Sequence, residues 1–145
     1  MARTSSDIVI SAPAADIMAV IADFDAYPQW ATGVRSADVV EMVGDRAKQV
    51  HFVLDAAPIR DEYDLSYDWN GDRGVSWHLV ESGSMLTGMD GSYELDTEGD
   101  TTRVTYQLAV NVSIPMLGML KRKAEKVVIE TALKGLKRRV EALRG

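Results

Sequence analysis

Asp61 is the residue whose type and position best suit acid–base chemistry. It lies in the segment 59–69, where one alternating set of residues is mostly apolar and aromatic and the other set is polar. This period of two predicts a strand with one covered face, and it places Asp61 on that face with Tyr63 and Tyr67. A carboxylic acid shielded from water in this way could exchange protons with a bound carbonyl compound. The alternative is that Asp61 begins the strand beside the Pro58 turn and is solvated.

Other nucleophilic and metal-binding residue types are scarce. The chain has no cysteine and only two histidines, His51 and His78, which excludes thiolate sites and histidine-rich metal centres. His78 is expected on the outward phase of its strand, whereas either phase is open for His51. No serine lies in a nucleophile elbow and no glycine-rich phosphate loop is present. We therefore predict no catalytic triad, no metal and no cofactor.

The elements that would position these residues follow from hydrophobic period and turn residues. Residues 4–11 alternate as a first strand, and a proline followed by an acidic residue suits the start of a short helix over 13–23. The segment 23–30 then breaks regular structure before Pro28 and carries the large aromatics Tyr27 and Trp30. From residue 34 to 112, turn residues punctuate six strands, which together form an antiparallel meander with one face available for packing.

The end of the chain predicts one long helix of roughly 25 residues after Pro115, because it is rich in Lys, Glu, Leu, Ala and Met. Residues 121–145 hold nine Lys or Arg against three Glu, on an otherwise acidic chain. These cations either complement the helix dipole and the acidic remainder or dock on an anionic membrane surface or RNA. The apolar positions divide between two helix faces: Leu117, Leu120, Ala124, Val127 and Thr131 on one, and Ile129, Leu133, Leu136, Val140 and Leu143 on the other.

This order of elements leaves one face of a wide sheet to be covered by few helices. If the sheet curls around the long helix, the space between them is lined by bulky, adaptable side chains that suit an apolar guest. The alternative is an ordinary packed core, and the pattern alone does not separate the two. Trp30, beside Tyr27, would guard the cavity mouth or plug the base of the sheet. The expected ligand-binding residues are Tyr63, Tyr67, Trp77, Met85, Met89, Tyr93, Tyr106, Met116, Leu120 and Trp30.

Composition bounds the class of protein. Hydrophobic residues make up 46% and charged residues 26% of the 145 positions, which is ordinary for a globular protein and unlike a disordered chain. At this length we expect a single domain over 1–145. The first residues contain no apolar run typical of a signal peptide, so we expect a cytoplasmic protein.

Three segments carry a resemblance to a known family. They are IVISAPAADI at 8–17, DFDAYPQW at 23–30, and VSIPMLG at 112–118 entering the last helix. With them the chain resembles the START-like, Bet v 1-like helix-grip (SRPBCC) superfamily, within its polyketide cyclase/dehydrase and lipid-transport group. The helix segment MLKRKAEK at 119–126 is similar to small single-domain actinobacterial members.

The resemblance implies an α+β helix-grip fold. In that fold a seven-stranded curved antiparallel sheet wraps around the long C-terminal helix, two short helices follow strand 1, and a ligand-sized cavity lies within. It transfers no catalytic residue, because relatives include aromatase/cyclases, carriers of sterols, phospholipids or quinones, and proteins that act through protein or ribosome contacts.

Three functions remain open. The favoured one is binding or carrying a hydrophobic small molecule, lipid-like or polycyclic, without catalysis. The second is a polyketide cyclase/dehydrase with Asp61 or a tyrosine as proton donor. The third is a protein, membrane or RNA interaction module that uses the basic C-terminal helix. We expect a monomer or weak homodimer whose partner is a small molecule or lipid, with transient membrane contact open and nucleic acid not expected.

Overall fold

The computed structural model describes residues 3–56, 59–81, 85–113 and 118–144. Its seven strands form a single sheet, and three short helical segments interrupt the chain between the first strand and the second. The strands are β1 (Thr4–Ile10), β2 (Val34–Val43), β3 (Arg46–Ala56), β4 (Ile59–Asn70), β5 (Gly74–Leu79), β6 (Leu86–Glu98) and β7 (Thr101–Val112). The helices are α1 (Ala14–Ala22), the 3-10 turn η1 (Phe24–Ala26), α2 (Tyr27–Trp30) and α3 (Gly118–Arg144).

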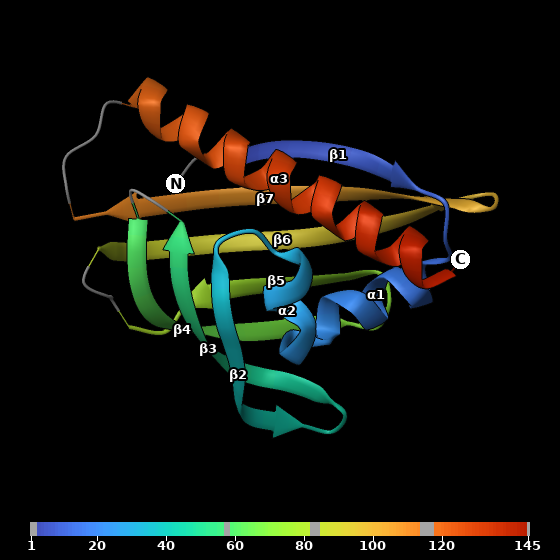
Figure 1. The fold of residues 1–145 in the computed structure, drawn as a ribbon, viewed down its shortest axis with the longest axis horizontal. Helices are drawn as coiled ribbons and strands as arrows, with labels where there is room; N and C mark the ends of the chain where they lie inside the picture. The colour runs from blue at the N-terminus through green and yellow to red at the C-terminus, as the bar shows by residue number, and fades with distance from the viewer. Residues whose placement is uncertain (1–2, 57–58, 82–84, 114–117, 145) are drawn as a thin grey trace.

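All strand pairs are antiparallel, and the order across the sheet is β1-β7-β6-β5-β4-β3-β2. Strands β2 to β7 follow one another as a meander, while β1 returns to pair with β7. The sheet curves, α3 runs along it beside β1 and β7, and α1 and α2 lie across the end of α3 that carries the C-terminus (Figure 1). This is the helix-grip fold that the resemblance implied.

Alternation along β4 sets the two faces of the sheet as the sequence predicts. Asp61, Tyr63 and Tyr67 are buried on the inner face, whereas their neighbours Glu62 and Asp68 are exposed. Period-two patterning therefore determines both the strand and its orientation.

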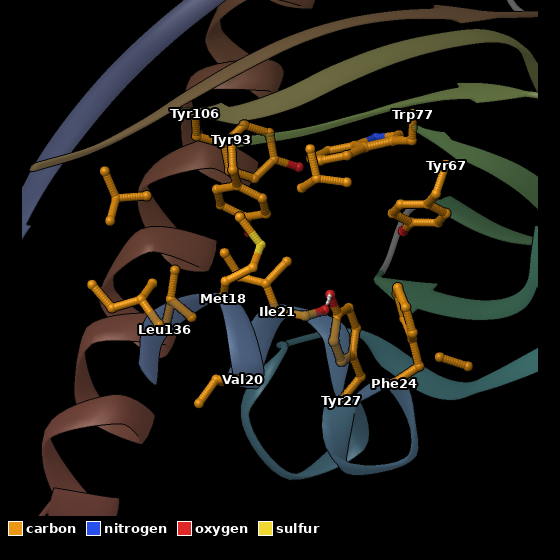
Figure 2. Packing of buried hydrophobic residues seen from close by; sticks show 14 of the residues in the cluster. Met18, Val20, Ile21, Phe24, Tyr27, Tyr67, Trp77, Tyr93, Tyr106 and Leu136 are labelled. Carbon is orange, nitrogen blue, oxygen red and sulfur yellow. Dashed lines mark hydrogen bonds between the residues drawn. The ribbon is translucent and has the colours of Figure 1, made fainter. Parts of the chain in front are cut away.

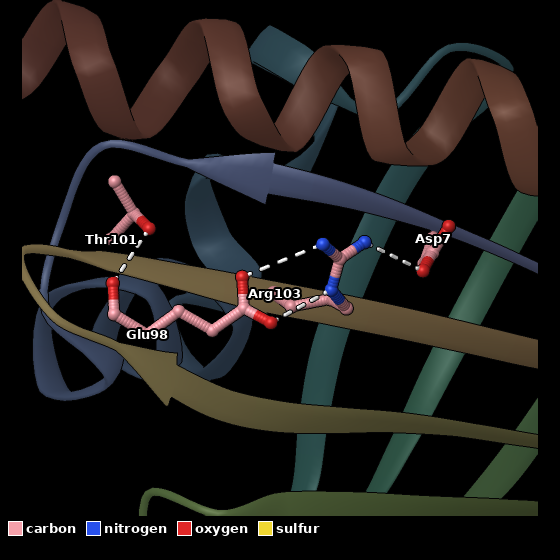
Figure 3. A network of polar contacts seen from close by, with 4 residues as sticks. All are labelled: Asp7, Glu98, Thr101 and Arg103. Carbon is pink, nitrogen blue, oxygen red and sulfur yellow. Dashed lines mark hydrogen bonds and ion pairs between the residues drawn. The ribbon is translucent and has the colours of Figure 1, made fainter.

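The outer face is polar, and Arg103 of β7 joins three strands there. Its guanidinium donates to Asp7 of β1 at 3.0 Å and to Glu98 of β6 at 3.0 Å, while the Thr101 hydroxyl donates to the Glu98 carbonyl (Figure 3). These solvated ion pairs set strand order more than they stabilise the fold.

Two short helical segments fill the stretch where the sequence indicates only a turn. Phe24 begins η1, and Pro28 occupies an early position of α2, where a missing N–H costs no hydrogen bond. Tyr27 donates its hydroxyl to the carbonyl of Ile21 at 2.5 Å, which ties α2 to α1.

Only one of the two apolar faces predicted for the long helix is buried. Ile129, Leu133, Leu136 and Val140 are at most 2% exposed. By contrast Leu120 and Val127 are 54% and 59% exposed. The helix therefore uses a single apolar stripe over its second half, and Leu117 lies outside the described residues.

Two glycines are required by close packing. A Cβ built on Gly91 of β6 would stand 2.3 Å from the Trp77 ring, and one on Gly135 of α3 would stand 2.7 Å from the carbonyl oxygen of Trp30. Both distances are shorter than real Cβ contacts. Glycine at position 135 therefore lets α3 approach the backbone of α2.

Candidate ligand-binding site

The inner face of the sheet carries a continuous group of aromatic rings. The ring centroid of Trp77 lies 5.8 Å from that of Tyr67, 5.4 Å from that of Tyr93 and 5.6 Å from that of Tyr106 (Figure 2). Tyr63 stacks on Phe52 with centroids 5.7 Å apart and an angle of 16° between the planes. Five predicted ligand-binding residues are therefore brought together, and their edges and faces suit flat apolar molecules.

Four tyrosine hydroxyls in this group form no hydrogen bond with the described residues; they belong to Tyr63, Tyr67, Tyr93 and Tyr106. Within the described part of the chain, the fully buried polar side-chain atoms that lack a hydrogen bond are Trp30 Nε1 and Arg46 Nη1. The four tyrosine oxygens are not among these atoms. These hydroxyls are therefore available to hydrogen-bond a guest or water.

Burial keeps these tyrosines protonated. Removal from water, followed by the influence of neighbouring tyrosines, raises the pKa of Tyr67 and Tyr93 well above the ordinary value of 10.0. Burial also raises the pKa of Tyr63 and Tyr106. The four groups are neutral O–H donors at any ordinary pH.

The inner face is less covered toward the end of the sheet where β7 leads to α3. Apolar side chains there are half-buried, while those further along the same strands are buried. We call these half-buried residues the rim: they are Leu54, Leu79, Met89, Val110 and Val112. Met85, just before β6, is also half-buried. Met85 and Met89, two of the three predicted methionines, therefore lie at the rim and not among the buried rings.

Asp61 points inward and is 7% exposed, so it is not a solvated strand end. Its Oδ2 accepts hydrogen bonds from the backbone N–H groups of Met85 at 3.0 Å and Leu86 at 2.8 Å, and its Oδ1 accepts one from Glu62 at 2.9 Å. Strand β5 ends at Leu79, before it can pair with these first residues of β6. The carboxylate thus occupies the place of a missing strand.

Glu125 also accepts a hydrogen bond from a backbone group beyond the end of a strand, here on the β1 side of β7. The sequence analysis did not select this residue. It is 3% exposed, and it accepts hydrogen bonds from the Thr4 hydroxyl and from the backbone N–H of Val110, both at 2.7 Å. Strand β1 starts at Thr4, which pairs with Leu108, so Val110 has no β1 partner. Glu125 is the only acidic residue in the basic run 121–126, which is the signal that could have indicated it.

The remaining predicted residues are Trp30, Leu120 and Met116. Trp30 is half-buried; its ring centroid is 5.0 Å from that of Tyr27, and its carbonyl faces Gly135 in the second half of α3. This position favours packing at the base of the sheet over guarding a mouth at the rim. Leu120 lies on the exposed face of α3 and not on its buried stripe, and Met116 lies outside the described residues.

The family follows from the whole sequence. The model of the family described as polyketide cyclase / dehydrase and lipid transport matches residues 1–144. The chain belongs to this family. No match was found among curated proteins.

Solved structures place this family member in the START-like, Bet v 1-like fold. A START superfamily protein from Mycobacterium smegmatis is 23% identical, with a TM-score of 0.90, over 97% of this chain and 98% of the other. A protein from Thermus thermophilus is 24% identical, with a TM-score of 0.82, over 99% and 100% of the two chains. The Zhui aromatase/cyclase from Streptomyces sp. R1128 is 15% identical, with a TM-score of 0.76, over 97% and 93%. The fold is one that binds hydrophobic ligands.

Both histidines lie away from the inner face. His78 is exposed, and His51 lies on the outer face of β3, where Nδ1 is 2.6 Å from Asp64 and Nε2 is 3.4 Å from Glu62. The hydrogen bond to Asp64 raises the pKa of His51 and lowers that of Asp64. Neither histidine can reach a molecule bound against the aromatic rings.

Among the depressions on the surface of this family member are two that adjoin the predicted residues Trp30 and Asp61. One of about 310 Å³ lies between α1 and the end of α3 and is crossed by the Asp16–Arg144 ion pair. A broad one of about 700 Å³ lies beside Leu54 and Asp61. In the described ranges no cluster of His, Cys, Asp or Glu is arranged to hold a metal ion, and no helix is long and apolar enough to cross a membrane.

Proposed function

We propose that this protein binds and carries a lipid-like or polycyclic molecule in an internal cavity between the inner face of the sheet and α3, without catalysis. One observation carries the proposal: four tyrosine hydroxyls on the aromatic inner face form no hydrogen bond with the described residues. A polar group at an apolar wall is costly unless a guest or water satisfies it. The half-buried rim supplies an apolar way in.

The lining favours one kind of guest. Flat or ring-containing surfaces gain from edge and face contact with Trp77, Tyr93 and Tyr106. Carbonyl oxygens on the guest would accept hydrogen bonds from the tyrosine hydroxyls, and hydroxyl groups on the guest would either accept from them or donate to them. We therefore expect oxygen-bearing ring compounds to bind more tightly than hydrocarbons of the same size.

The groups that face the interior support binding without a reaction. Asp61 is engaged by backbone N–H groups of β4 and β6, and the tyrosines have raised pKa values, which keep them from acting as bases near neutral pH. The charged outer-face cluster around His51 lies on the far side of the sheet.

Native mass spectrometry of the protein purified from its source organism tests the proposal. We expect a co-purified small molecule that is displaced by an oxygen-bearing polycyclic probe such as a hydroxyanthraquinone. Tyr93→Phe with Tyr106→Phe should weaken that probe by roughly tenfold, since two hydrogen bonds are lost. Anthracene, which has no oxygen, should bind both proteins equally. Absence of any guest, together with no binding of either probe, would show that the interior is an ordinary packed core.

A cyclase/dehydrase remains the second candidate, because Asp61 and the protonated tyrosines share the inner face. Asp61→Asn separates the two functions. An enzyme that uses Asp61 as its proton donor would lose turnover of a linear polyketide substrate. A carrier would keep its affinity for the hydroxyanthraquinone within about twofold, since the isosteric amide removes the acid but preserves shape.

A further inference from the structure

The first three turns of α3 expose an unusual amount of apolar surface. We call residues 119–128 the projecting half of α3. Within it only Glu125 is buried. Met119 is 77% exposed, Leu120 54%, Val127 59% and Val128 50%. A cluster of large exposed apolar side chains on one helix is a feature of interaction surfaces.

Cations are interleaved with these apolar residues. Arg122, Lys123 and Lys126 are all exposed. The one acidic residue of the segment, Glu125, is turned inward and bonded to Thr4 and Val110. Outward, the projecting half therefore presents apolar and positive groups only.

The apolar residues share a helix face. Leu120, Ala124 and Val127 recur at spacings of four and three residues, and Lys123 lies on the same face. The buried stripe of Ile129 and Leu133 points to another side of the helix. An exposed apolar face with lysine and arginine along it is typical of helices that lie in a membrane interface.

The segment is fixed next to the rim. Glu125 joins it to β1 and β7, and Lys121 donates to the Asn111 side chain at 2.7 Å. Val110 and Val112 of the rim belong to the same end of β7. A surface that touched the projecting half would therefore also lie beside the rim.

We propose that the projecting half of α3 docks the protein on an anionic lipid bilayer. Leu120 and Val127 enter the headgroup region while Lys123, on the same face, and Lys126, further round the helix, contact lipid phosphates. A second copy of this chain fits less well, because two such faces would bring like charges together. RNA would match the cations but would leave the apolar side chains without a use. Docking goes beyond the binding of a ligand, and it would hold the end of the sheet that carries the rim near the lipid from which a ligand could be taken.

Flotation with phosphatidylcholine vesicles, with and without phosphatidylglycerol, tests the docking. We expect binding only when the anionic lipid is present, and weaker binding as salt is raised. Leu120→Glu with Val127→Glu should abolish it. Lys123→Gln with Lys126→Gln should weaken it by about fivefold for each cation. Leu143→Glu is the matched control, because Leu143 is 62% exposed in the last turn of the same helix; this variant should bind as the parent does.

Several results would overturn the proposal. They are no binding to anionic vesicles at moderate salt, equal binding to vesicles without phosphatidylglycerol, or equal losses from Leu143→Glu and the Leu120/Val127 pair. If light scattering showed that the parent is a dimer and that Leu120→Glu with Val127→Glu is a monomer, the face would be assigned to self-association instead. RNA binding lost in the Lys123/Lys126 pair, without vesicle binding, would assign it to RNA. Binding of the hydroxyanthraquinone, measured without vesicles, distinguishes a failure of membrane docking from a failure of the carrier function.

Discussion

The indole ring of Trp77 occupies the space that a side chain at position 91 would need. Trp77 and Gly91 are direct partners across β5 and β6, and a Cβ on Gly91 would stand 2.3 to 2.5 Å from three atoms of the indole. Glycine here lets a large ring lie on the neighbouring strand, an arrangement in which the aromatic side chain covers the bare backbone. The position of Trp77 in the aromatic lining depends on it.

Gly91→Ala should therefore displace Trp77 and destabilise the protein by about 1–3 kcal/mol, the usual cost of overpacking a core. Urea denaturation measures the free energy of unfolding, and near-ultraviolet circular dichroism reports the environment of the tryptophan ring. Gly88→Ala in the same strand is the control, because its Cβ would meet only the Asn111 side chain, at 3.3 Å. Equal losses from the two substitutions would mean that the Trp77 contact does not limit position 91.

Gly135→Ala should destabilise the protein although alanine is the better helix former. The higher helix propensity of alanine favours the substitution by about 1 kcal/mol in a helix interior. The new methyl group, however, would stand 2.7 Å from the backbone carbonyl oxygen of Trp30. Backbone cannot turn aside as a side chain can, so we expect a net loss of about 1–2 kcal/mol. Thermal unfolding of Gly135→Ala beside Lys134→Ala, at an exposed neighbour, checks the sign. A raised melting temperature would contradict the close approach.

Asp61→Ala should cost about 1–3 kcal/mol, because the N–H groups of Met85 and Leu86 would lose their acceptor. Asp61→Asn keeps one carbonyl oxygen and should cost less. Hydrogen exchange of the Leu86 amide, measured by NMR, should be faster in the alanine variant than in the asparagine variant. Unchanged exchange in both would remove the structural role given to Asp61.

The His51–Asp64 pair predicts a modest pH dependence of stability. The folded pKa of His51 is raised from 6.5, so its contribution is complete below that pH and is lost as pH rises through the raised pKa. The folded pKa of Asp64 is lowered from 3.8, so its contribution is present above that pH and is lost as pH falls through the lowered pKa. The pair therefore stabilises the folded protein most between pH 3.8 and pH 6.5.

Because both side chains are partly solvated, the His51–Asp64 pair should contribute at most about 1 kcal/mol to the free energy of unfolding. Urea unfolding from about pH 4 to 8, for the parent and for His51→Gln, isolates it; only the parent should lose stability as the pH rises above 6.5. His78→Gln, at an exposed position, should behave as the parent. A parent profile with the same slope as His51→Gln would show that the pair makes no net contribution.

The fold could be predicted where a local pattern records burial. The alternation of β4 indicated the strand and its inner face, and the scarcity of turn residues after Pro115 indicated the long helix. The sequence predicts a turn over 23–30, but the two short helical segments found there are fixed by contacts of Phe24 and Tyr27 with the sheet and not by periodicity.

The site could be predicted only in part, since its remaining features depend on distant chain segments. The inward direction of Asp61 follows from alternation, but its partners lie 24 and 25 residues away, beyond a strand that ends early. Leu120 and Ile129 are both apolar helix residues on opposite faces of α3, and which face is buried depends on how the helix is rotated against the sheet. No spacing along the chain contains that rotation.

Asp61 and Glu125 allow the strands next to the rim to end early without a change in the register of the sheet. Each acid takes over backbone groups that a longer strand would have paired, so the short ends of β5 and β1 leave no bare amides at these described positions. Residues could be added or removed at those ends without moving the tyrosine-lined interior, whose pairing lies further along the strands. The edge of the inner face at the rim can therefore change in length while the aromatic rings behind it keep their positions.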